Sequence, residues 1–312
     1  MEEKSLYYVQ KILEEGSFSR AAKKLFIAQP SLSQYIGRIE ENLGAHIFDR
    51  NAKTIKLTVA GEIYLQTEEK IQQLRELRIK QIEDTSQLKR GHLTIGSSHY
   101  RSMYLLTRVL PVFKQKYPGI TIKLEEGITE RLEDCAALGI TDFSIVLLPL
   151  SHPALAYEEI YQEEIVLALP ASHPLCEWTE NKRSQFPPYP SMDFSLLKED
   201  PFIIMKKGQK LRDSFFHLCQ DAGFRPQIIL ESDSMAAAQA LTAAGVGSTI
   251  LPDTLATQNK FPQMPGYFSL KNAVMPRRIV VAFSQERSLT NAAKAFIRVM
   301  KDVIAAGEMA EK

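Results

Sequence analysis

Cysteine and long hydrophobic runs are scarce in this sequence. Its 312 residues include only three cysteines, Cys135, Cys176 and Cys219, too far apart for the Cys-x-x-Cys spacing of a zinc site or for a disulfide framework. No apolar run approaches the roughly 18 residues that a membrane span needs. The first four residues are acidic and lack the apolar core of an export signal. We therefore expect a cytoplasmic protein with no membrane partner and with reduced, buried thiols.

Catalytic motifs are also missing. The sequence contains no Gly-rich phosphate loop, no Gly-x-Ser-x-Gly and no His-Glu-x-x-His. Its histidines never take the spacing of metal ligands. We therefore predict no catalytic residues, no metal site and no cofactor, and we expect that the chain is not an enzyme. A solute-binding protein is the alternative from another class, but it would leave residues 1–88 unexplained and would need an export signal.

Positive and negative side chains almost balance, which leaves a net charge of +1. The distribution is nevertheless uneven, because residues 17–58 carry seven Lys or Arg side chains against three acids. A local basic patch on a nearly neutral protein indicates a polyanionic partner for that segment. A solvated helix face would explain the charge equally well.

Three short helices are predicted at the N-terminal end. The first covers residues 4–14, and Ser17 is placed to cap a second helix over 18–25. The third begins near Pro30, which a first helical turn tolerates, and Gly44 ends it. The apolar positions of the third helix recur at i, i+4, i+7 and i+11, which predicts one buried face: Leu32, Ile36, Ile39 and Leu43.

The opposite face of the third helix is polar and includes Ser31, Gln34 and Arg38. Such side chains suit contacts with base edges and phosphates in a major groove, so the second and third helices form a helix-turn-helix. Residues 47–58 predict two short strands around a basic tip, the wing. With double-stranded DNA as the partner, the candidate contacts are Ser17, Gln29, Pro30, Ser31, Ser33, Gln34, Arg38, Arg50 and Lys53.

Four segments follow one another between residues 16 and 61. They read Gly-Ser-Phe-Ser-Arg-Ala-Ala-Lys-Lys-Leu, Ala-Gln-Pro-Ser-Leu-Ser-Gln, Leu-Gly-Ala-His-Ile-Phe-Asp-Arg and Leu-Thr-Val-Ala-Gly-Glu. This series resembles the signature of the LysR-type transcription regulators. The resemblance implies a sequence-specific regulator with an N-terminal DNA-binding domain and a C-terminal domain that binds a small effector.

A long polar helix is predicted over residues 59–88, with Thr58 as its cap. Its imperfect apolar stripe needs a partner surface: Ile71, Leu74, Leu77 and Ile82. Packing on the chain's own C-terminal domain would also bury the stripe. The resemblance favours pairing of two chains, hence a homodimer or homotetramer, and adds RNA polymerase as a candidate partner.

From Gly91 onward, strands and helices alternate, which predicts parallel sheets covered by helices. Two such blocks, joined near 165–168 and 266–278, suggest two lobes with a cleft. The predicted fold is thus an N-terminal all-α winged helix-turn-helix, a linker helix and a C-terminal α/β, two-lobed, periplasmic-binding-protein-like domain. The expected boundaries are 1–58, 59–90 and 91–312, with lobe I about 91–165 and 268–312 and lobe II about 166–267.

The effector site is expected in the cleft, where strands end and helices begin. Hydroxyl groups and helix N–H groups there favour a small anion, although capping alone would also explain Ser98. Arg101 could assist if its side chain turns inward. The candidate effector contacts are Ser97, Ser98, His99, Thr129, Met205 and Lys206.

Two further segments receive an interpretation. Residues 176–195 are rich in proline and predict an irregular surface loop without an assigned function. The segment from Lys210 to Cys219 resembles the redox segment of the family's peroxide sensors, which carry a peroxidatic cysteine where this chain has Lys210. Because one thiol of that pair is absent, we expect that Cys219 packs inside a helix interface and senses nothing.

Overall fold

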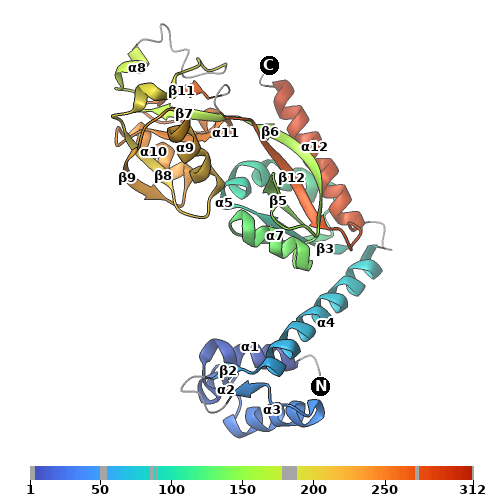
Figure 1. The fold of residues 1–312 in the computed structure, drawn as a ribbon. Helices are drawn as coiled ribbons and strands as arrows, with labels where there is room; N and C mark the ends of the chain where they lie inside the picture. The colour runs from blue at the N-terminus through green and yellow to red at the C-terminus, as the bar shows by residue number, and fades with distance from the viewer. Residues whose placement is uncertain are drawn as a thin grey trace. The chain divides into compact units, whose positions relative to one another are not determined.

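The computed structural model describes residues 4–49, 55–84, 88, 90–177, 188–270 and 274–310. By its internal contacts the chain divides into two compact units, Met1–Ile82 and Glu83–Lys312 (Figure 1). Among the described residues, no helix is long and apolar enough to cross a membrane.

The N-terminal unit is a winged helix-turn-helix. Helices α1 (Ser5–Glu15), α2 (Phe18–Lys24) and α3 (Gln29–Leu43) precede strands β1 (Phe48–Asp49) and β2 (Lys56–Leu57), which pair antiparallel, and the long helix α4 (Val59–Asp84) follows. The apolar side chains of these elements meet in one small core: Val9, Ile12, Ala21, Ala22, Leu32, Ile36, Ile47 and Phe48. The predicted three helices and two wing strands are therefore confirmed. The tip of the wing lies outside the described residues.

Local signals at the helix ends are confirmed in part. Gly44 adopts the left-handed conformation that ends α3, with φ of 66°. The Thr58 hydroxyl accepts a hydrogen bond from the Gly61 amide at 3.0 Å and so caps α4. Ser17 is the N-cap residue of α2, as predicted, but its side chain makes no capping hydrogen bond. The apolar pattern predicts a buried Leu43, and this is wrong, because the residue is 49% exposed.

Lobe I contains a five-stranded sheet in the order β4-β3-β5-β12-β6. Its strands are β3 (Gly91–Ser97), β4 (Ile120–Glu126), β5 (Phe143–Leu147), β6 (Leu155–Glu163) and β12 (Arg277–Ser284). One face packs on α6 (Thr107–Lys116) and α12 (Asn291–Ala310), and the other packs on α7 (Thr129–Leu138). The chain enters α6 through α5 (His99–Arg101) and a π-helical turn (Ser102–Leu106).

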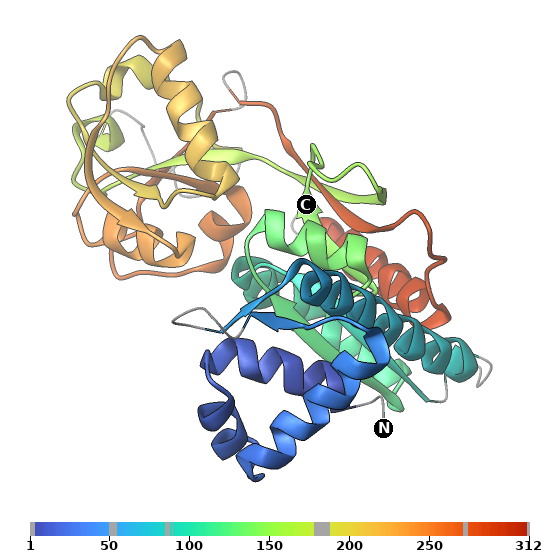
Figure 2. The same ribbon diagram turned by 60° about the horizontal axis from the view of Figure 1, so that its bottom comes forward.

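Lobe II combines an antiparallel trio, β10-β7-β11, with a parallel pair, β8-β9. Its strands are β7 (Ile165–Leu169), β8 (Pro201–Met205), β9 (Gln227–Ser232), β10 (Thr249–Pro252) and β11 (Gly266–Ser269). Its helices are α8 (Pro174–Glu177), a 3-10 turn (Phe194–Leu197), α9 (Lys210–Asp221), α10 (Met235–Ala243) and α11 (Asp253–Gln258). Strand β6 leads into β7 between the lobes, and these two strands pair with β12 and β11, respectively (Figure 2).

Three expectations about this domain need correction. The sheets are not purely parallel, because β12 runs antiparallel to both β5 and β6, and β7 runs antiparallel to its neighbours. Lobe II extends past the expected boundary at 268, since Phe268 and Leu270 are buried in its core. The Pro-rich segment is not wholly a surface loop, because Phe194 near its end is also buried in that core; residues 178–187 lie outside the described residues.

Candidate DNA interface and effector site

Helix α3 presents its polar N-terminal half to solvent. Gln29, Pro30, Ser31, Gln34 and Arg38 are exposed. These five predicted DNA contacts therefore lie on one accessible element, which a major groove can accommodate.

The remaining predicted DNA contacts are less uniform. Ser33 on α3 and Ser17 before α2 are each half-buried, and Arg50 and Lys53 in the wing tip lie outside the described residues. Arg20, which contributes to the basic patch, donates from Nε to the Glu15 carbonyl at 2.8 Å. The Arg20 guanidinium is therefore partly engaged by a backbone carbonyl of the protein itself.

A buried carboxylate that the sequence pattern did not reveal holds α3 against the wing. Glu40 is 6% exposed. Its Oε1 accepts hydrogen bonds from the backbone amides of Ile47 at 2.9 Å and Phe48 at 3.4 Å, and its Oε2 lies 3.2 Å from Nδ1 of His46. The Glu40 carboxylate thus serves these two backbone amides as a hydrogen-bond acceptor in place of a backbone carbonyl.

A cavity of about 700 Å³ lies between the two lobes. Lobe I supplies the start of α5, the start of α7 and Arg277 on β12, and lobe II supplies the starts of α9 and α10. Throughout, this space is called the interlobe cavity. Its position at strand ends and helix beginnings matches the predicted location of the effector.

Two arginines in the wall of the interlobe cavity share one carboxylate. Arg101 is 4% exposed and its Nη2 lies 3.4 Å from Glu163 Oε1, which Arg277 also contacts through Nη2. The Nε atoms of both arginines and Oε2 of Glu163 make no hydrogen bond within the described part of the chain. The arginine side chains therefore retain unused donors close to the cavity.

Lys210 joins the two lobes beside this cavity. From the start of α9 in lobe II, its Nζ donates to the carbonyl oxygens of Leu147 at 2.9 Å and Pro149 at 2.7 Å in lobe I. It also lies 3.9 Å from Oε1 of Glu133, a carboxylate that is 1% exposed. Burial lowers the pKa of Lys210, although Glu133 opposes the shift.

The structure brings three of the six predicted effector contacts to the cavity, namely Ser98, His99 and Thr129. Ser98 is partly engaged as a cap, since its Oγ accepts from the Arg101 amide at 3.4 Å. His99 points Nδ1 toward Glu126 Oε2 at 3.2 Å. No hydrogen bond of the Thr129 hydroxyl to any described residue is present, so this hydroxyl is available to a ligand.

The other three predicted effector contacts do not line the cavity. Ser97 is fully buried at the end of β3, and Met205 packs in the core of lobe II. Lys206 is exposed and forms an ion pair with Asp233 at 2.5 Å. As effector contacts these three residues stay predictions that the cavity does not support, because side chains at a strand end alternate between the crevice and the core and the sequence does not show which way each one points.

The cysteine interpretation agrees with the structure. Cys219 is 2% exposed in the core of lobe II, and burial raises the pKa of its thiol to about 11. A thiol with such a pKa carries little thiolate at neutral pH, so its redox reactivity is low.

Two family models match the chain. The model described as "Bacterial regulatory helix-turn-helix protein, lysR family" covers residues 4–62, and the one described as "LysR substrate binding domain" covers residues 86–305. Among curated relatives, the uncharacterized HTH-type transcriptional regulator YcgK of Bacillus subtilis (strain 168) is 29% identical over 97% of this chain and 94% of its own. The HTH-type transcriptional regulator AlsR of the same organism is 31% identical over 81% of each.

Solved structures of similar fold include full-length regulators. CbnR complexed with its target DNA matches with a TM-score of 0.69 and 22% identity over 97% of this chain and 100% of that one. At this identity the similarity establishes the fold, which confirms the predicted architecture. The relatives are transcription regulators and not enzymes. From its family models and relatives, this chain is a member of the LysR family, a DNA-binding transcription regulator with a C-terminal effector-binding domain.

Proposed function

We propose that this regulator responds to a small organic anion that binds in the interlobe cavity. The observation that carries the proposal is the sharing of one carboxylate, Glu163, by the two arginines Arg101 and Arg277. Burying a charge without a full counter-charge costs free energy. A ligand that supplies a negative charge at this wall removes part of that cost.

The charges at the wall of the interlobe cavity favour a monoanion. Arg101, Arg277 and Lys210 line the cavity with three positive charges, and the carboxylates that contact them, Glu163 and Glu133, supply two negative charges, so one positive charge is left over at this wall. The ion pairs at the rim of the cavity are solvent-exposed and screened, so they change this balance little.

The remaining lining favours an organic body on that anion. Apolar side chains from both lobes face the same space: Met103, Ile128, Leu147, Leu211, Met235 and Ala236. Cavities that bind small molecules combine such surfaces with a few polar groups that fix orientation. Thr129 adds a hydroxyl at the start of α7, where the helix dipole also favours negative charge.

On the DNA side, the proposal assigns base reading to Gln34 and phosphate contacts to Arg38. An amide offers one donor and one acceptor, the pair that adenine presents in the major groove. Phosphate contacts from Arg50 and Lys53, assembly as a homodimer or homotetramer, a contact with RNA polymerase and a cytoplasmic location remain predictions of the same proposal.

The effector part is tested by calorimetry on the full-length protein with small carboxylic acids, each compared with its neutral primary amide. We expect that at least one acid raises the melting temperature and that its amide does not, because only the charged form completes the pairing. Thr129→Val should raise the Kd of that acid about tenfold through loss of one charge-assisted hydrogen bond. The matched control Thr121→Val, on exposed strand β4, should leave the Kd unchanged. Equal binding of acid and amide, no binding by any acid, or an unchanged Kd in Thr129→Val contradicts the proposal.

A further inference from the structure

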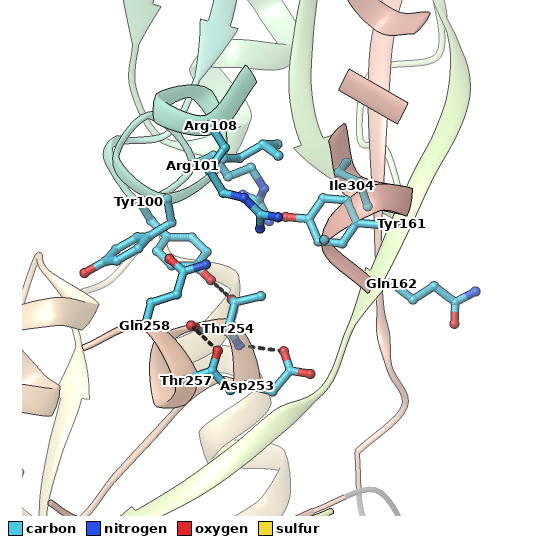
Figure 3. A pocket seen from close by; sticks show the side chains of 13 residues that line it. Tyr100, Arg101, Arg108, Tyr161, Gln162, Asp253, Thr254, Thr257, Gln258 and Ile304 are labelled. Carbon is cyan, nitrogen blue, oxygen red and sulfur yellow. Dashed lines mark hydrogen bonds between the residues drawn. The ribbon is translucent and has the colours of Figure 1, made fainter. Parts of the chain in front are cut away.

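A second, smaller cavity lies next to the interlobe cavity. It has a volume of about 180 Å³. Tyr100, Arg101 and Tyr104 line both spaces, so these side chains form the wall between them. Beyond that wall, the lining comes from α6, β6, α11 and α12, and it includes none of the predicted effector contacts (Figure 3).

The lobe I side of this second cavity holds a cation without a partner. Arg108 on α6 reaches toward α12, where a Cβ on Gly307 would lie 2.0 Å from its Nη2. The guanidinium thus occupies the space beside Gly307 that a larger side chain would share. Arg108 is exposed, and within the described residues it forms no ion pair and no hydrogen bond, so a ligand would replace water at its donors.

The lobe II side holds a carboxyl group without a cation. Asp253, the first residue of α11, accepts a hydrogen bond from the Thr254 amide at 2.8 Å, and no Lys, Arg or His among the described residues pairs with it. Burial, assisted by the nearby charge of Glu163, raises the pKa of Asp253 to about 6. An ammonium group placed beside this carboxyl would therefore find an under-compensated negative charge.

We infer that the second cavity binds a small zwitterion of the α-amino acid class, with its ammonium group at Asp253 and its carboxylate at Arg108. The two complementary charges stand in separate walls of one cavity, and Figure 3 shows Arg108 entering from α6 and Asp253 from α11. The volume is below the roughly 300–1,000 Å³ of sites for drug-sized ligands, which suits a small metabolite. Hydroxyl and amide groups of Tyr104, Thr257 and Gln258 complete a polar lining.

This site goes beyond the proposed anion response, because its ligand would be held by Arg108 and Asp253, which do not line the interlobe cavity, and would carry both charges. Its ligand would tie the lobes together, since Arg108 belongs to lobe I and Asp253 to lobe II. Side chains already cross there: Tyr100 bonds Thr254 through their hydroxyl groups, and Asn259 donates to the Tyr104 hydroxyl at 3.0 Å. A bound zwitterion would add to these contacts and favour one arrangement of the lobes, so it would couple to the interlobe cavity.

The test uses the full-length protein and the free proteinogenic amino acids, each compared with its N-acetyl derivative and its primary amide. We expect that at least one free amino acid raises the melting temperature and that both blocked forms fail, because each lacks one charge. In calorimetry, Asp253→Asn and Arg108→Gln should each raise its Kd at least tenfold. The matched exposed controls Asp302→Asn and Arg225→Gln should bind as the unmodified protein does.

A variant of the interlobe cavity separates this inference from the proposed function. Thr129→Val should keep amino acid binding, whereas Asp253→Asn and Arg108→Gln should keep the response to carboxylic acids. Amino acid binding that survives both charge replacements and is lost in Thr129→Val would place the ligand in the interlobe cavity and overturn the inference. Absence of binding by any free amino acid at millimolar concentration overturns it as well.

Discussion

The carboxylate of Glu40 shows how a single buried charge can position a DNA-reading helix. Its Oε1 accepts hydrogen bonds from the amides of Ile47 and Phe48, where the first wing strand begins, while its backbone lies in α3. Hydrogen bonds to a charged acceptor are stronger than neutral ones, and a buried amide left without a partner is costly. The relative position of helix and wing therefore depends on this residue.

Replacing Glu40 by Gln should loosen that connection. The neutral amide weakens the bonds to Ile47 and Phe48, at a cost of about 1.5–3 kcal/mol to local stability. We expect faster hydrogen exchange at these two amides in the full-length protein and weaker binding to operator and random DNA alike. Glu41→Gln, an exposed neighbour on the same helix, is the matched control and should exchange normally. Unchanged exchange in Glu40→Gln would show that the wing is held by its apolar contacts alone.

Gln34 carries the prediction for sequence reading. Truncation to Ala removes the donor and acceptor that pair with adenine, which should cost about 1–3 kcal/mol at a single operator position. Selection of bound sequences from a random pool measures this as lost preference at that position only. Arg38→Gln, a phosphate-contact variant on the same exposed face, should weaken binding to all sequences and lower the salt slope by about one. An unchanged base preference in Gln34→Ala would contradict the assignment.

Asp253 makes the stability of the effector domain depend on pH. In the folded protein its pKa is about 6, above the ordinary value of 3.8. Below pH 3.8 the carboxyl is neutral in both states. Between 3.8 and 6 the unfolded chain loses the proton first, so the stability falls as the pH rises. Above pH 6 the ionised carboxyl lowers the free energy of unfolding by a constant amount, at most about 3 kcal/mol.

The replacement Asp253→Asn should remove this penalty. Its melting temperature relative to the unmodified protein should rise between pH 4.5 and 6.5 and then stay level, because only the unmodified side chain becomes charged over that interval. Thermal melts across this range provide the measurement. Asp221→Asn at the exposed end of α9 is the control and should give a difference that does not vary with pH. A flat difference for Asp253→Asn would show that the carboxyl is better solvated than its burial indicates.

At the scale of elements, apolar periodicity predicted the helices well. Helix α1 begins and ends one residue later than the predicted range 4–14, and α3 begins one residue before the predicted Pro30. The edge strand β6 was not predicted, because its sequence, Leu-Ala-Tyr-Glu-Glu-Ile-Tyr-Gln-Glu, alternates little and much of it is only half-buried. Strand β12 and its antiparallel direction were not predicted, since the chain returns from lobe II before this strand pairs, and no local pattern encodes such a return.

The effector site was predicted by position more than by chemistry. Strand-end residues such as Ser98 and Thr129 could be found because they directly precede or open helices. The pairing of Arg101 with Glu163 could not, because 62 residues separate them and a charged side chain is ordinarily expected at the surface. Lys210 likewise gave no signal of its contacts with carbonyl oxygens in the other lobe.

For the whole effector domain, the charged wall of the cavity coincides with the connections between the lobes. Glu163 ends β6 just before the chain enters lobe II, and Arg277 begins β12 just after the chain returns. The two residues are register partners across these strands. A ligand anion that competes with Glu163 for an arginine therefore binds beside the connections between the lobes. A small backbone change there would alter the position of one lobe relative to the other. The ligand can shift this equilibrium only if it binds one arrangement of the lobes more tightly than the other.

Assembly of two chains is the remaining prediction for the whole molecule, and α4 supplies its surface. Ile63, Ile71, Leu74 and Ile82 fall within an arc of about 100° on this helix, and Ile63, Leu74 and Ile82 are 61%, 59% and 63% exposed. Pairing with a second copy would remove this apolar area from water. Leu74→Lys combined with Ile82→Lys should convert the oligomer to a monomer in light scattering and weaken binding to two half-sites far more than to one. Gln66→Lys adds one such charge outside the arc and should leave the mass unchanged, whereas an oligomer that persists in the double variant would place the interface elsewhere.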